Sequence, residues 1–131
     1  MAIQFILYTA IALLFTHELD AMLAQEWLVL PLTSWLPPDL GKTVFVYFHI
    51  PLFAGLLFGL AHQNPKVRMR TQWGLMLFVV IHSILHALFS HHSQYHFHGF
   101  HSQLFIFLPA ALGLLWLLNH HRVIKLTSSD D

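Results

Sequence analysis

Histidine is the most frequent ionisable residue of this chain, and several histidines stand at spacings that suit metal binding. The sequence has 12 histidines, against 6 lysines plus arginines and 6 aspartates plus glutamates. His82 and His86 are four residues apart, so on a helix both imidazoles project from one stripe and can hold one metal ion. His17 and Asp20 are three residues apart, which places them about 60° from each other on one helix face.

Carboxylates and a further histidine fall in the same apolar stretches. An ionised side chain near the centre of a bilayer costs roughly 2.5–3.5 kcal/mol on insertion scales. Glu18 and Asp20 have no lysine or arginine at a matching depth, so their partners must be histidines, a bound cation or a proton. We therefore predict an intramembrane metal site, with Glu18 as its general base or as a group that orients a ligand. The predicted ligands are His17, Asp20, His49, His82 and His86.

The donor set also limits the metal. The chain has no cysteine, so thiolate sites, thiol catalysis and disulfides are excluded. Imidazoles with a carboxylate suit zinc or a non-haem iron better than copper(I). The simplest alternative is a network of hydrogen-bonded imidazoles that holds helices together.

Long apolar runs must position these residues. Hydrophobic residues make up 56% of the chain, charged residues only 9%, and the mean hydropathy is +0.62. Four segments approach the roughly 20 residues that cross a bilayer as a helix. They cover about residues 2–23, 43–61, 73–90 and 104–118. These runs predict an all-α, polytopic membrane protein with four helices in an up-down bundle, forming one integral membrane domain over residues 1–131.

Polar residues separate the four segments. Pro31, Pro37, Pro38 and Gly41 are expected to fill the first loop, and Asn64-Pro65 to end the second helix. With a net charge of zero, no electrostatic field attracts a polyanion, so the predicted partner is the lipid bilayer and not nucleic acid.

The basic residues predict how the chain crosses the membrane. Five of the six lie in the second loop or the C-terminal tail: Lys66, Arg68, Arg70, Arg122 and Lys125. By the positive-inside rule these segments face the cytoplasm. Both termini are then cytoplasmic in the cell's inner (plasma) membrane, and the predicted metal site lies near the outer face.

The chain resembles an uncharacterised family of small bacterial integral membrane proteins. The resemblance rests on a His-Glu-x-Asp-Ala stretch at 17–21 followed by Glu26-Trp27, on His49-x-Pro-Leu, and on His82 with His86. It covers nearly the whole chain. The chain is more distantly similar to the HXXEE membrane proteins. The resemblance implies four helices with a polar intramembrane site, and it implies no particular activity.

Several functions fit these residues. The first is a metal-dependent, hydrolase-like protein with its site at the outer surface. The second is a di-iron membrane oxidase, hydroxylase or desaturase, because the histidines from 82 to 98 faintly resemble the histidine boxes of that class. The third is proton or cation passage, which would need a homo-oligomer. The fourth is a non-enzymatic accessory subunit of a larger membrane complex.

Overall fold

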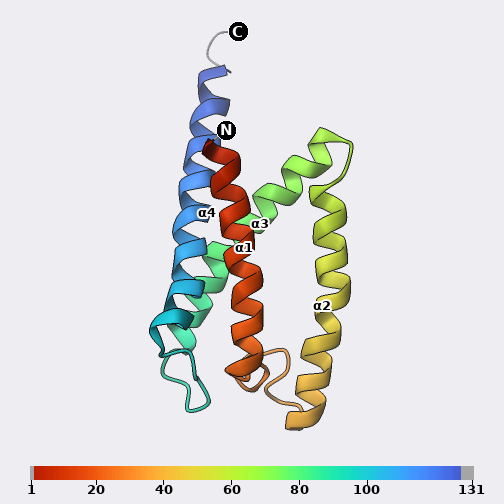
Figure 1. Ribbon diagram of the computed structural model, residues 1–131, viewed down its shortest axis with the longest axis vertical. Helices are drawn as coiled ribbons and strands as arrows, with labels where there is room; N and C mark the ends of the chain where they lie inside the picture. The colour runs from red at the N-terminus through yellow and green to blue at the C-terminus, as the bar shows by residue number, and fades with distance from the viewer. Residues whose placement is uncertain (1, 128–131) are drawn as a thin grey trace.

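The computed structural model describes the backbone of residues 2–127 and the side chains of residues 3–120. Its elements are α1 (Ala2–Leu23), the 3₁₀ turn η1 (Glu26–Leu28), α2 (Pro38–Leu60), α3 (Pro65–Phe89) and α4 (Phe100–Thr127). The four long helices alternate in direction along the chain (Figure 1). Each is long and apolar enough to cross a membrane. The predicted all-α architecture with four membrane helices is therefore confirmed.

Helices α2 and α3 begin earlier than the predicted spans because proline is well suited to the first turn of a helix. Pro38 opens α2 and Pro65 opens α3, where the missing N–H costs nothing and φ is already helical. The Asn64 side chain accepts a hydrogen bond of 2.9 Å from the Lys66 backbone N–H and caps α3. The prediction that Pro38 and Gly41 lie in a loop was wrong, since both belong to α2.

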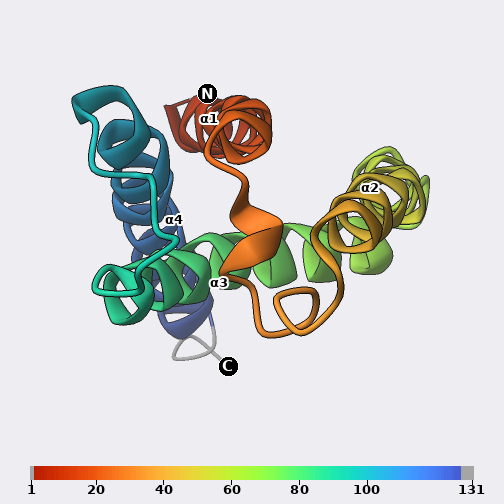
Figure 2. The ribbon, with the colours of Figure 1, turned by 90° about the horizontal axis from the view of Figure 1, so that it is seen from below.

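Three helices pack closely and the fourth stands apart. Helix α4 packs along both α1 and α3, whereas α2 contacts mainly α3 and η1 (Figures 1 and 2). Between α1 and α2 the contacts are made by long side chains, including the rings of Phe15 and Phe53, whose centroids are 5.0 Å apart. A small part of α2 is buried, so most of its apolar surface is left for lipid.

Two apolar clusters stabilise the three packed helices. One lies towards the N-terminus of α1 and includes Leu7, Leu14, Met76 and Trp116. The other lies at the opposite end of α1 and contains Ala21, Ala24, Trp27, Phe45, Tyr95, Phe97 and Ile106. The second cluster surrounds the end of α1, the η1 turn and the loop before α4. These segments carry the polar side chains considered next.

A glycine sets the distance between α3 and α4. A Cβ atom on Gly113 would lie 2.6 Å from Cγ2 of Val79 and 3.0 Å from the backbone oxygen of Met76. The β-branched Val79 side chain has little freedom to move away, so only glycine permits this approach. Gly74, also in α3, would meet nothing within 4 Å if it carried a Cβ.

We expect Gly113→Ala to destabilise the fold by about 1–3 kcal/mol, because overpacking pushes α3 away from α4. Thermal unfolding in detergent, followed by circular dichroism, measures the change. Gly74→Ala is the matched control and should leave the melting temperature unchanged or raise it. Equal shifts for the two variants would show that the α3–α4 approach does not depend on Gly113.

Candidate metal centre

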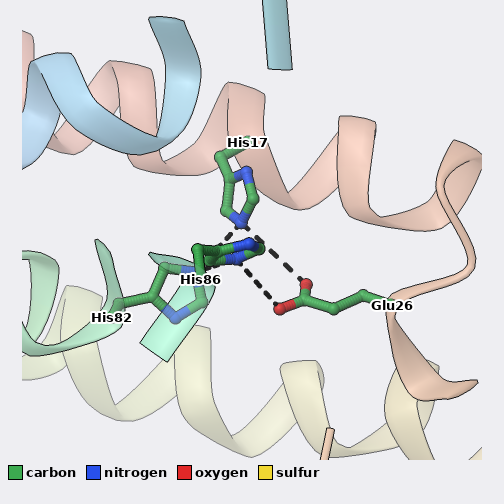
Figure 3. A group of neighbouring side chains, drawn as sticks. All are labelled: His17, Glu26, His82 and His86. Carbon is green, nitrogen blue, oxygen red and sulfur yellow. Dashed lines mark hydrogen bonds and ion pairs between the residues drawn. The ribbon is translucent and has the colours of Figure 1, made fainter. Parts of the chain in front are cut away.

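Four side chains from three elements point toward one another near one end of the packed helices. His17 comes from α1, His82 and His86 come from α3, and Glu26 comes from η1 (Figure 3). Each of them offers one ligand atom, and the four atoms lie within 4.8 Å of one another. We call this set the His/Glu cluster.

The distances within the cluster connect its members in a ring. Nε2 of His82 lies 2.9 Å from Nε2 of His17 and 3.1 Å from Nε2 of His86. The Glu26 carboxylate lies 3.3 Å from Nε2 of His86 and 3.9 Å from Nε2 of His17. A tetrahedral ion with bonds of 2.0–2.1 Å has ligand atoms separated by about 3.3 Å. The first three distances match that separation within a few tenths of an ångström.

Three of the four side chains of the cluster are buried, and His82 is partly exposed. The exposed fraction is 0% for His17, 4% for Glu26 and 5% for His86. Burial by itself would raise the pKa of the Glu26 carboxyl, but the hydrogen bond with His86 and the neighbouring imidazoles outweigh it and lower that pKa below its usual value. Glu26 therefore stays ionised and offers a carboxylate oxygen as a ligand.

A backbone turn brings Glu26 to the cluster. Helix α1 ends at Leu23, and Gln25 then adopts the left-handed conformation, with φ of 57° and ψ of 46°. That conformation is unfavourable for a residue with a Cβ by roughly 1–2 kcal/mol. It reverses the chain, so that η1 lies between α1 and α3 (Figure 2). Strain of this kind persists where surrounding contacts hold it.

Two aromatic residues of the loop before α4 close over the cluster. The Tyr95 hydroxyl lies 3.2 Å from Nδ1 of His86, the nitrogen that faces away from the cluster. The Phe97 ring packs on both His86 and His17, at centroid distances of 4.8 and 5.6 Å. Burial raises the pKa of the Tyr95 hydroxyl, which therefore remains protonated. Nδ1 of His17 is buried without a hydrogen-bond partner.

The chain also matches a known family. A model of a family of unknown function, DUF6713, matches residues 3–123. The chain belongs to DUF6713. The match confirms membership of an uncharacterised family, and it covers every residue of the His/Glu cluster. No curated protein and no solved structure matches the chain.

In this DUF6713 chain, three of the five predicted ligands come together and two do not. His17, His82 and His86 share the His/Glu cluster, whereas Asp20 and His49 lie outside it. Asp20 has one buried carboxylate oxygen without a hydrogen-bond partner. The carboxylate of the cluster comes from Glu26, which the sequence analysis singled out only as part of the family resemblance.

Glu18 and His49 form a separate pair that joins α1 to α2. Nε2 of His49 lies 2.9 Å from a carboxylate oxygen of Glu18. Nδ1 of His49 lies 2.6 Å from the backbone oxygen of Phe45, one turn earlier in α2. Since the oxygen of Phe45 can only accept, Nδ1 carries a proton and donates it there. The Glu18 carboxylate, which was predicted to be a general base, is thus held by a histidine of the neighbouring helix.

The loop histidines stay apart from the cluster. They are exposed: His91, His92, His96, His98 and His101. Among the described side chains, the His/Glu cluster is the group that brings at least three metal-binding residues together. The histidine boxes suggested by the sequence therefore do not assemble into a second metal-binding group within this part of the chain.

We expect Glu18 and His49 to be energetically coupled, because their contact fastens an otherwise loosely packed α2. A double-mutant cycle of Glu18→Ala and His49→Ala, measured by thermal unfolding in detergent, should give a coupling of roughly 0.5–1.5 kcal/mol. The same cycle with Glu18→Ala and His91→Ala is the control and should give none. A zero coupling for the first pair would mean that α2 is held by apolar contacts alone.

Proposed function

We propose that this protein is an integral membrane protein with a mononuclear transition-metal centre at His17, Glu26, His82 and His86. The observation that carries the proposal is the convergence of three Nε2 atoms and one carboxylate from three elements, all within 4.8 Å. Buried ionisable groups in a membrane protein are costly and mark functional sites. Three of the four side chains are buried, so the cluster is not a group of exposed residues that happen to lie near one another.

A metal ion accounts for the contacts better than hydrogen bonds between imidazoles. Each Nε2 of a neutral imidazole carries either one proton or one lone pair. Nε2 of His82 is close to two other Nε2 atoms, so one hydrogen bond leaves its second contact unsatisfied. A single cation is attracted to all three lone pairs and to the carboxylate at once. Tyr95 supports this arrangement, because its hydroxyl can accept the Nδ1 proton of His86.

The ligand set favours zinc or iron. Three imidazoles and one carboxylate would complete the tetrahedral shell of a zinc ion. The same four groups would leave two positions free on a six-coordinate iron. A metal with a free coordination position would supply Lewis-acid chemistry, which is the basis of the hydrolase-like activity that we keep as a proposal. In that activity Glu18 would accept a proton, and His49 would hold its carboxylate in place.

We place the centre near the outer face of the cell's inner (plasma) membrane. The basic side chains Lys66, Arg68 and Arg70 begin α3, at the opposite end of that helix from His82 and His86. The positive-inside rule assigns the basic end to the cytoplasm. The side chains of Arg122 and Lys125, which contributed to the predicted orientation, lie outside the described residues.

The cluster also gives a reason for the stretch on which the family resemblance rests. His17 begins the His-Glu-x-Asp-Ala sequence and Glu26 precedes Trp27, so this region supplies two of the four ligands. We infer that it is a signature of DUF6713. The more distant likeness to HXXEE proteins stays a prediction.

Metal content tests the proposal directly. We expect untagged, detergent-purified protein to hold about one zinc or iron ion per chain by mass spectrometry. His17→Ala, His82→Ala and Glu26→Gln should each lower the affinity by at least about tenfold, since each removes a ligand. His49→Ala and Asp20→Asn, whose side chains lie outside the cluster, should keep the metal. If the wild-type protein holds no metal, the proposal is wrong and the cluster is a network of hydrogen-bonded side chains.

Cysteine labelling tests the orientation of the protein in the membrane. The chain has no native cysteine, so only the introduced cysteine can react. We expect Ser34→Cys and Ser93→Cys to react with a membrane-impermeant maleimide added to intact cells. Gln63→Cys should react only after the membrane is permeabilised. The reverse pattern would place the centre on the cytoplasmic side.

A further inference from the structure

A small cavity adjoins one side of the His/Glu cluster. Glu26, His82 and His86 form one of its walls, whereas His17 does not line it. Its volume is about 20 Å³. A cavity needs roughly 10–15 Å³ by this measure to hold one water molecule. The space therefore has room for a ligand of one or two heavy atoms.

The other walls of the cavity are apolar. Val29 and Leu30 follow η1, and Leu85 and Phe89 come from one stripe of α3, four residues apart. On the side of the loop before α4, the cavity is closed by Tyr95 and Phe97, both of which are buried. A ligand in this space would contact the imidazoles of His82 and His86 and the carboxylate of Glu26 on one side. On the other sides it would contact mainly aliphatic and aromatic carbon atoms.

The rim of the cavity lies on the apolar surface of the protein. Leu85 is 38% exposed, and Leu30 and Phe89 are partly exposed. Leu85 and Phe89 belong to a helix that is apolar enough to cross the membrane. A molecule that enters here comes from the surroundings of α3 and passes no charged side chain of the lining before it reaches Glu26. Such a path favours uncharged molecules, because moving an ion through apolar surroundings is costly.

We propose that this cavity is the binding position for a small uncharged ligand of diatomic size, which reaches the metal between Leu30, Leu85 and Phe89. The inference rests on the proposed metal centre and adds a ligand class and a route to it. It also favours a metal with free coordination positions. The ligand approaches on the side of Glu26, His82 and His86, because these members of the cluster line the cavity and His17 does not.

Nitric oxide is a suitable probe because it is uncharged, diatomic and spectroscopically visible on iron(II). We expect the full-length, iron(II)-loaded protein in detergent to give an iron–nitrosyl signal by electron paramagnetic resonance. Leu85→Trp should slow nitric oxide binding by at least about tenfold without loss of iron, since the larger ring fills the rim. Leu88→Trp is the matched control, because Leu88 is 71% exposed on α3 and does not line the cavity. It should bind nitric oxide at the wild-type rate.

A size test completes the experiment. tert-Butyl isocyanide, which is too large for the cavity, should not bind to the wild type and should begin to bind to Leu85→Ala. The ligand route would be overturned if the iron-loaded protein did not bind nitric oxide, or if the two tryptophan variants bound it at equal rates. Neither result would contradict the metal centre. A centre that accepts zinc and refuses iron would overturn it too, because four protein ligands complete the zinc shell. Protein that binds no metal would overturn both proposals.

Discussion

Keeping an ionised carboxylate away from water determines how this chain is arranged at one end of its helices. Glu26 is 4% exposed, and within the described side chains its ion-pair partners are histidines. A buried carboxylate is stable only when several donors or a cation compensate for its lost hydration. His17 and His86 must therefore reach the same point from different helices, which fixes the position of α1 relative to α3. The turn at Gln25 and the closing of the Tyr95–Phe97 segment follow from the same requirement.

The rest of the fold serves this arrangement. Gly113 lets α4 lie against α3, and α4 also packs along α1. The two helices that carry the histidines, α1 and α3, are therefore both held by α4. Helix α2 contributes no member of the cluster, and its polar contact with α1 is the Glu18–His49 pair. The division agrees with the surface of the molecule, since a smaller share of α2 is buried than of the other three helices.

Hydropathy was enough to predict the four helices, and the sequence also named three of the four members of the cluster. The spacing of His82 and His86 placed them on one stripe, and both reach the cluster from that stripe. Asp20 shares a face with His17 by the same rule, but sharing a face does not bring two side chains to one point. Glu26 could not be placed in this way, because it follows the end of α1. Helical periodicity does not predict where a side chain points once the chain has passed the left-handed residue Gln25. The remaining signal was chemical: Glu26 is an acid in an apolar stretch with no basic residue nearby.

Residues 95–98 of the loop before α4 alternate between the inside and the outside of the protein. Tyr95 and Phe97 are buried, whereas His96 and His98 are exposed, so successive side chains of this extended segment face opposite ways. Which side chains of this segment face the interior therefore depends on its register with the cluster. A shift of this segment by one residue would turn the two rings toward solvent and two imidazoles toward the cluster. The four residues from Tyr95 to His98 therefore have a register that must be kept, even though the turns before them are polar and exposed.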